Sequence, residues 1–213
     1  MEVEERWAAI EAERRSLAEL LSELTPQQWD APSLCSEWRV RDVAAHVAMT
    51  PSGPTAGTIV VGLAKARGDL WGFGRDVARE HARRPVAQIV AELDRDAAAR
   101  TMPFLTNARN ILMDALVHGQ DIAVPLGIER TMPVPAALAG FERVWRMGWP
   151  FHARRRLRGF RLVATDGPVD VGEGVAVEGR VQDLLLLITG RTAAAAERLH
   201  GPGVADLARA SRP

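Results

Sequence analysis

Hydrophobic residues recur at helical spacing over most of the first 155 residues, which predicts a mainly helical fold there. Apolar positions alternate with Glu and Arg in the first such segment, as in a helix with one buried face. Pro and Gly clusters separate the segments from one another. The predicted helices cover residues 3–24, 39–49, 58–79, 85–102, 107–124 and 135–156.

The pattern changes after residue 157, where short β-like runs replace the helical repeat. Residues 160–165 and 175–179 have strand character, and the turn signal Asp166-Gly167-Pro168 follows the first of them. The strongly apolar run Val181–Ile188 ends before Gly190, and its leucine content favours a buried helix over a strand. We therefore expect a mostly α protein with an α+β tail, divided into a helical bundle (1–156) and a small α+β domain (157–213).

Composition and charge argue against nucleic acid and membrane as binding partners. The chain has 213 residues and a formal net charge of zero, whereas a protein that holds nucleic acid through phosphates needs a basic excess. No apolar run approaches the roughly 18 residues that cross a bilayer, and the acidic N-terminus does not resemble a secretory signal. The single cysteine, Cys35, cannot form an internal disulfide. We expect a cytoplasmic protein, monomeric or homodimeric, that binds neither nucleic acid nor membrane.

Two histidines on predicted helices suggest a metal site. His46 falls between Val43 and Val47 on an inward face, and Asp114 precedes His118 by one helical turn. If the two helices pack side by side, His46, Asp114 and His118 form a facial ligand set with an open coordination position. Imidazole and carboxylate suit zinc, iron, nickel or manganese, so the metal stays open. Asp121 either ligates as well or orients His118 from outside the set.

Simpler structural interpretations exist for each of these residues. An inward histidine is commonly a core residue with satisfied hydrogen bonds, and an Asp/His pair four residues apart often only stabilises a helix surface. His81, His152 and His200 lie among arginines or beside Gly-Pro, so we expect them to be solvated. Cys35 precedes the second helix, where a small apolar packing role is favoured over a nucleophilic one.

Two arginines are candidates for binding a substrate anion. Arg154 belongs to a basic run that suits a solvated helix end beside the negative pole of the helix dipole. Its alternative role is an anion pocket at the domain junction. Arg191, which follows Gly190, is the second candidate for holding a carboxylate.

Several segments resemble the mycothiol-dependent maleylpyruvate isomerase family, which belongs to the DinB-like metal-binding four-helix bundles. The first runs from Leu24 to Cys35 and continues through Trp38 to Val47, and the second is Asp114-x-x-x-His118-Gly-Gln-Asp121. The tail is similar to the family's small C-terminal domain at Ala164-Thr165-Asp166, Gly172-x-Gly174, Val177-x-Gly179, Asp183-Leu184-Leu185 and Gly190-Arg191.

The resemblance implies a zinc-type site on His46, Asp114 and His118, with mycothiol as thiol cosubstrate. The isomerase often has Glu where this chain has the shorter Asp114, which leaves room for Asp121 to share the ligand role. The basic residues are almost all arginine, as expected of the GC-rich bacteria that make mycothiol.

The implied activity is addition of a metal-activated thiolate to a small electrophile. In an isomerase the thiolate attacks a conjugated cis double bond, rotation follows and the thiol leaves; in a transferase the adduct is the product. The alternative from another class is a non-catalytic metal-binding or regulatory protein built on the same bundle. A helical bundle with unrelated core histidines would bind no metal.

Overall fold

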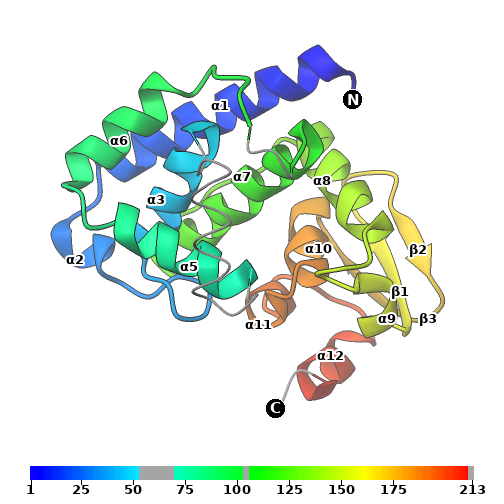
Figure 1. Cartoon of the computed structure of the whole chain (residues 1–213). Coiled ribbons are helices and arrows are strands. Elements are labelled where there is room, and N and C mark those ends of the chain that lie inside the picture. The colour runs from blue at the N-terminus through cyan, green and yellow to red at the C-terminus, as the bar shows by residue number, and fades with distance from the viewer. Residues whose placement is uncertain (53–69, 103–105, 211–213) are drawn as a thin grey trace. The chain divides into compact units, whose positions relative to one another are not determined.

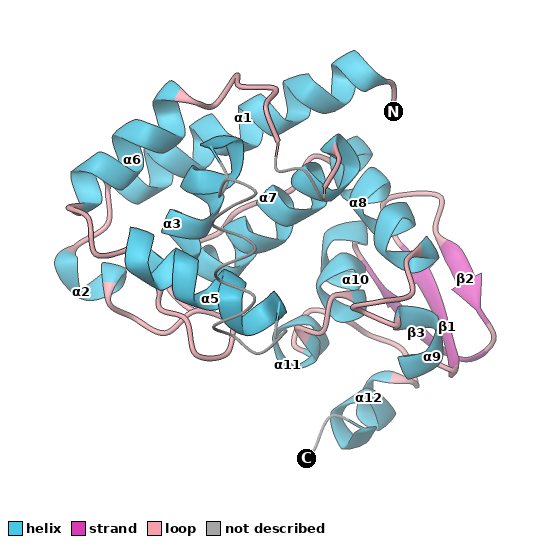
Figure 2. Cartoon of the chain, viewed as in Figure 1, coloured by secondary structure: helices cyan, strands magenta, loops and turns pink. Residues whose placement is uncertain are grey.

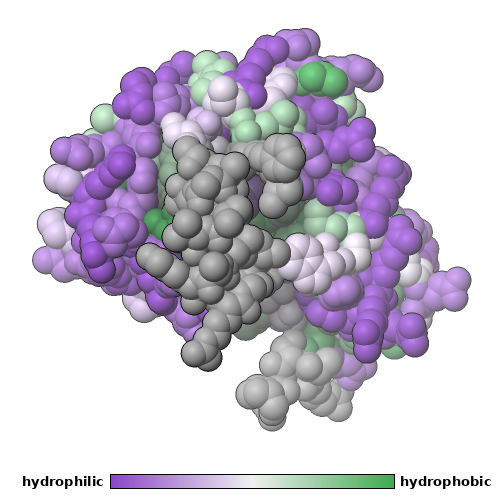
Figure 3. All heavy atoms as spheres, in the orientation of Figure 1, coloured by the Kyte–Doolittle hydropathy of each residue, from purple (hydrophilic) through white to green (hydrophobic). Residues whose placement is uncertain are grey.

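The computed structural model describes residues 1–52, 70–102 and 106–210. By its contacts the chain divides into an N-terminal unit, Glu2–Arg130, and a C-terminal unit, Thr131–Pro213. On the face shown in Figure 3, most of the described side chains are hydrophilic, and a smaller number of hydrophobic ones lie between them. None of the helices in the described ranges has both the length and the apolar character that a membrane span requires.

The N-terminal unit is a four-helix bundle (Figure 1). Helices α1 and α3 each pack against both α6 and α7, which closes a ring of four helices, and α5 packs on α3. The described helices of this unit are α1 (Val3–Ser22), α2 (Pro26–Trp29), α3 (Val40–Met49), the 3-10 turn η1 (Thr50–Ser52), α5 (Leu70–His81), α6 (Val86–Arg95) and α7 (Ala108–Ala123). The predicted helical bundle is therefore confirmed.

Local sequence sets the starts of these helices. Thr25 and Gln28 form a reciprocal capping box at α2, and the side chain of Asn107 accepts hydrogen bonds from main-chain N–H groups at the start of α7. At α3 the main-chain N–H of Arg39 donates to Asp42 Oδ2 (2.9 Å). These caps explain why helix starts could be predicted to within a residue or two.

Apolar side chains of all four helices fill the centre of the bundle. Each side chain of this kind contributes roughly 1.5–3 kcal/mol when it is fully removed from water. The core contains Ile10, Leu17 and Leu21 of α1, Val40, Val43 and Val47 of α3, Ile89 and Leu93 of α6, and Leu112, Leu116 and Ile122 of α7.

The C-terminal unit combines a small sheet with a buried helix (Figure 2). Strand β1 (Gly159–Ala164) lies between β2 (Asp170–Gly172), to which it is antiparallel, and β3 (Gly174–Gly179), to which it is parallel. A Cβ on Gly174, whose φ is +123°, would overlap the main-chain oxygen of Gly159, so the link from β2 to β3 requires glycine there. The helices are α8 (Val134–Arg146), α9 (Ala153–Arg156), α10 (Val181–Ile188), α11 (Thr192–Ala196) and α12 (Val204–Ala210).

The strand predictions and the buried helix α10 are confirmed, and other details differ. Strand β2 was not predicted, because three residues are too few to show an alternating pattern. The helix predicted over 135–156 ends at Arg146, before Gly148 and Pro150, and α9 follows separately. The helix from Pro85 already ends at Arg95.

Two further expectations concern boundaries. Of the helix predicted over 58–79, residues 70–79 lie in α5, and the part before residue 70 lies outside the described residues. The sequence pattern placed the domain boundary after residue 156, whereas contacts assign α8 and α9 to the C-terminal unit because α8 packs along α10.

Candidate metal centre

Helices α3 and α7 pack against each other and bring His46, Asp114 and His118 together. The Nε2 atom of His46 lies 3.1 Å from Asp114 Oδ2, and the Nε2 atom of His118 lies 3.3 Å from Asp114 Oδ1. The centroids of the two imidazole rings are 4.9 Å apart. Asp114 therefore faces one ring nitrogen of each histidine with a different carboxylate oxygen.

The chemistry of this cluster fits a divalent cation. One ligand atom from each of His46, Asp114 and His118 can be chosen so that all three lie within 4.8 Å of one another. Ligands held at about 2.0 Å in a tetrahedron stand about 3.3 Å apart, close to the 3.1 and 3.3 Å contacts of Asp114 with the two histidines. The side chains of His46 and Asp114 are 30% and 32% exposed, so the cluster is open on one side. Three protein ligands and an open side are the features of a catalytic rather than a closed structural site.

Electrostatics couples Asp114 to both histidines. Burial alone would raise the pKa of Asp114, but the charges of His118 and His46 and their hydrogen bonds outweigh it and hold that pKa well below its usual range. Burial alone would lower the pKa of His118, but the Asp114 charge and the hydrogen bonds to Asp114, Asp121 and Cys35 raise it well above its usual range. Without a metal, the cluster thus favours a charged carboxylate and a protonated His118.

The other ring nitrogen of His118 faces a buried carboxylate. Nδ1 of His118 donates to Asp121 Oδ2 over 2.8 Å, and the Asp121 side chain is 0% exposed. The thiol of Cys35 also donates to Asp121 Oδ2, at 3.0 Å, and lies 3.8 Å from His118 Nδ1. Of the two roles open for Asp121, this placement behind His118 favours orientation of the ring over direct ligation.

Cys35 and Trp38 are site residues that sequence reasoning missed. Cys35 was expected to pack as a small apolar side chain, whereas its sulfur contacts Asp121 and His118. The ring of Trp38 lies against both histidines, with centroids 5.3 Å from His46 and 6.0 Å from His118. The only available signal was that both belong to the first of the segments on which the family resemblance rests.

The remaining histidines correct one expectation. His81 was expected to be solvated, but it is largely buried and its Nε2 lies 2.7 Å from Glu92 Oε2, close to the short turn that joins the end of α5 to the start of α6. Arg84 also reaches that oxygen, at 3.3 Å. His152 and His200 are exposed, as predicted.

The candidate anion-binding arginines both belong to the C-terminal unit. The guanidinium of Arg154 lies over the ring of Trp145, 5.8 Å from its centroid, and Arg191 Nη1 donates to the carbonyl of Thr189 at 2.9 Å. Their role in holding a substrate carboxylate stays a prediction.

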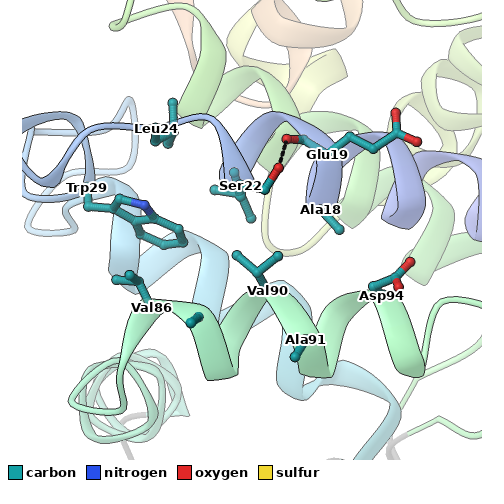
Figure 4. Close-up of a pocket in the computed structure, with 11 residues that line it drawn as sticks. Ala18, Glu19, Ser22, Leu24, Trp29, Val86, Val90, Ala91 and Asp94 are labelled. Atoms are coloured by element: carbon teal, nitrogen blue, oxygen red, sulfur yellow. Dashed lines mark hydrogen bonds between the residues drawn. The ribbon is translucent and has the colours of Figure 1, made fainter.

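A groove elsewhere in the bundle is separate from this cluster. It lies between α1, α2 and α6, and Figure 4 shows Leu24, Trp29, Val86 and Val90 on its walls and Asp94 at one end. None of the residues that line it belongs to the candidate metal centre.

Comparison with known proteins identifies the bundle. Residues 10–104 match the family model of the mycothiol maleylpyruvate isomerase N-terminal domain. The match lies within the N-terminal unit and covers 95 of the 213 residues of the chain. The resemblance predicted from the sequence is thereby confirmed, although the matched residues stop before Asp114 and His118.

Solved structures show the same fold over at least 90% of the chain. A crystal structure of the mycothiol-dependent maleylpyruvate isomerase is 16% identical, with 90% of each chain covered and a TM-score of 0.53. A histidine-to-alanine mutant of the mycothiol-dependent maleylpyruvate isomerase is 15% identical, with 95% of this chain and 93% of that chain covered and a TM-score of 0.55. No curated protein matches the chain.

Proposed function

We propose that this protein is a divalent-metal-dependent enzyme that uses a low-molecular-weight thiol, mycothiol, to isomerise a small electrophilic substrate. The observation that carries the proposal is the convergence of two imidazole nitrogens on Asp114 within a bundle of the mycothiol maleylpyruvate isomerase family. Zinc is the metal we expect first, and nickel, iron and manganese suit the same donors.

The residues of the proposed site have two roles, metal binding and orientation of a metal ligand. His46 and His118 present Nε2 lone pairs, and Asp114 supplies a negative charge between them. A divalent cation bound by these three residues would lower the pKa of a thiol bound to it and so would supply a thiolate nucleophile near neutral pH. Asp121 keeps a proton on Nδ1 of His118, which leaves Nε2 free to bind. The partial exposure of His46 and Asp114 admits the thiol and the substrate from the open side.

In the proposed reaction the thiolate adds to one carbon of a conjugated cis double bond. The former double bond becomes a single bond and rotates, and loss of the thiolate restores the double bond in the trans form. The thiol is regenerated in each turnover. Isomerisation is preferred to transfer because the solved structures of the same fold are named as isomerases, and the comparisons offer no such support for a transferase. A non-catalytic metal-binding protein is the remaining alternative.

Metal content measured by mass spectrometry tests the site. We expect about one equivalent of metal in the purified protein, retained in the His200→Ala control and lost in His46→Ala and His118→Ala. His200 is a suitable control because it is an exposed histidine of the C-terminal unit. Metal retained in both site variants would contradict the site.

A thiol-dependent assay then tests the activity. Maleylpyruvate is the first substrate to test. Its absorbance change is recorded with mycothiol present and with mycothiol absent. We expect turnover that requires mycothiol and leaves its concentration unchanged. Equal turnover without the thiol would refute the thiol step, consumption of the thiol would indicate transfer, and bound metal without any turnover would favour the non-catalytic alternative.

A further inference from the structure

The proposed metal site has a second layer that involves the single cysteine of the chain. We propose that Cys35 is a positioning residue: its thiol holds the Asp121 carboxylate, and Asp121 holds His118 with Nε2 turned toward the metal ligands. This inference rests on the proposed function, because it concerns the same site.

The hydrogen bonds converge on one oxygen atom. Asp121 Oδ2 accepts from His118 Nδ1 at 2.8 Å and from the Cys35 thiol at 3.0 Å. Asp121 is fully buried, and a buried carboxylate is costly unless hydrogen bonds compensate its lost hydration. The thiol is 3.8 Å from His118 Nδ1, a much longer contact than its contact with Asp121. Its proton is therefore directed to the carboxylate.

Main-chain hydrogen bonds hold the loop that carries Cys35 against α7. The N–H of Cys35 donates to Ser33 Oγ at 3.1 Å, and the N–H of Trp38 donates to the carbonyl of Cys35 at 3.1 Å. The N–H of Leu34 donates to the main-chain carbonyl of Asp121 at 3.1 Å. The last bond joins the loop directly to α7, so the thiol and the carboxylate are positioned by the same contact.

Orientation of His118 matters because an imidazole binds a metal through one nitrogen while the other selects the tautomer. A carboxylate that accepts from Nδ1–H fixes the ring plane and leaves the Nε2 lone pair for the ion. Loss of such an outer partner typically weakens metal binding 10- to 100-fold. Cys35 acts through Asp121, so its removal is expected to have a smaller effect than removal of the carboxylate.

Cys35, His118 and Asp121 also satisfy the general distance requirement for a metal-ligand group. Their individual distances argue against that role. A sulfur and an oxygen that share a tetrahedral ion stand about 3.5 Å apart, whereas the Cys35 sulfur is 3.0 Å from Asp121 Oδ2, a hydrogen-bond distance. The contacts of Asp114 with the two histidines are closer to ligand spacing.

Zinc affinity of the full chain, measured by competition with a chromophoric chelator, tests the proposal. We expect Asp121→Asn to weaken binding 10- to 100-fold and Cys35→Ala to weaken it about three- to tenfold. Cys35→Ser keeps a donor in the same place and should restore most of the affinity. Ser36→Ala is the matched control, since Ser36 is an exposed residue of the same loop. Thermal unfolding followed by circular dichroism identifies any variant that does not fold.

Two spectroscopic readouts separate positioning from other roles. In the metal-free protein, the hydrogen-bonded Nδ1–H of His118 should give a downfield proton NMR signal in wild type and Cys35→Ser that weakens in Cys35→Ala. This signal also distinguishes failure of the inference from failure of the proposed function, because it requires no metal. With Co²⁺ bound, the spectrum should lack a thiolate-to-cobalt charge-transfer band. Such a band, lost in Cys35→Ser, would make Cys35 a ligand and overturn the proposal, as would unchanged zinc affinity and an unchanged NMR signal in Cys35→Ala.

Discussion

The two sides of the His118 ring differ in accessibility and in chemistry. The Nε2 side faces Asp114 and His46, both about one-third exposed, whereas the Nδ1 side faces Asp121, which is fully buried, and beyond it Cys35. An exchangeable ligand needs the open side, and a fixed ring orientation needs the closed side. A binding site of this kind therefore needs an accessible face for its ligands and a buried face that supports them, and His118 belongs to both.

Removal of either histidine should have the largest effect, and the two variants should differ in how much stability the metal-free protein loses. If both are ligands as proposed, His46→Ala and His118→Ala should each abolish metal binding. Only His118→Ala also leaves the buried Asp121 carboxylate without its imidazole partner, so the metal-free protein should lose about 3–5 kcal/mol of unfolding free energy. His46 is partly exposed, so His46→Ala should lower the unfolding free energy by less. Chemical denaturation of both metal-free variants measures these losses of unfolding free energy. Equal losses would contradict the distinction between the exposed and the buried side of the site.

The pH dependence of metal binding should reflect the coupling between the two sides. An imidazole binds a metal only when deprotonated, and the surroundings raise the pKa of His118 well above its usual range. Protons therefore compete with the metal, and zinc affinity should rise about tenfold per pH unit up to that raised pKa. The pKa of Asp114 is lowered, so this carboxylate stays charged and adds no competition from pH 6 to 8. Chelator competition at pH 6, 7 and 8 measures the slope; a flat profile would be inconsistent with it.

Adding one methylene to Asp114 or to Asp121 compares the space available on the exposed side and on the buried side of His118. Asp114→Glu adds the methylene on the exposed side, where the longer side chain has room, so zinc affinity should stay within about tenfold. Asp121→Glu must fit the same extra group into a fully buried space, which costs about 1–3 kcal/mol of stability. Thermal denaturation and zinc titration of the pair check this, and the reverse order of effects would contradict the burial argument.

A substitution at Gly119, which follows His118 on α7, tests the contact of this helix with Arg130. A Cβ at Gly119 would lie 2.8 Å from Nε of Arg130, whose guanidinium forms a largely buried ion pair with Glu13 on α1. Relative to a glycine-to-alanine change at an uncrowded helix position, Gly119→Ala should therefore lower the unfolding free energy by about 1 kcal/mol or more. Gly74→Ala on α5 is the matched control: nothing lies within 4 Å of its Cβ, and Ala favours the helix by up to about 1 kcal/mol. Equal effects in denaturant titrations would show that Arg130 adapts without cost.

Local sequence features account for most of what could be predicted. Helical periodicity and caps such as Thr25 and Asn107 depend on neighbours within one or two turns, so the bundle helices could be located from the sequence. Strand β2 escaped prediction because its pairing with β1 depends on the sheet rather than on three residues. The burial of His81 escaped as well, because its Glu92 partner lies on the next helix.

The sequence by itself determined that Asp114 and His118 share a helix face, because four residues make about one turn of an α-helix. It also determined that His46 lies on the same side of its helix as Val43 and Val47. Only the tertiary structure decided that His46 meets Asp114, 68 positions away, and that Cys35 meets Asp121, 86 positions away. The physical reason is that contacts between distant segments depend on how complete helices pack, and packing is a property of many side chains together rather than of any local pattern.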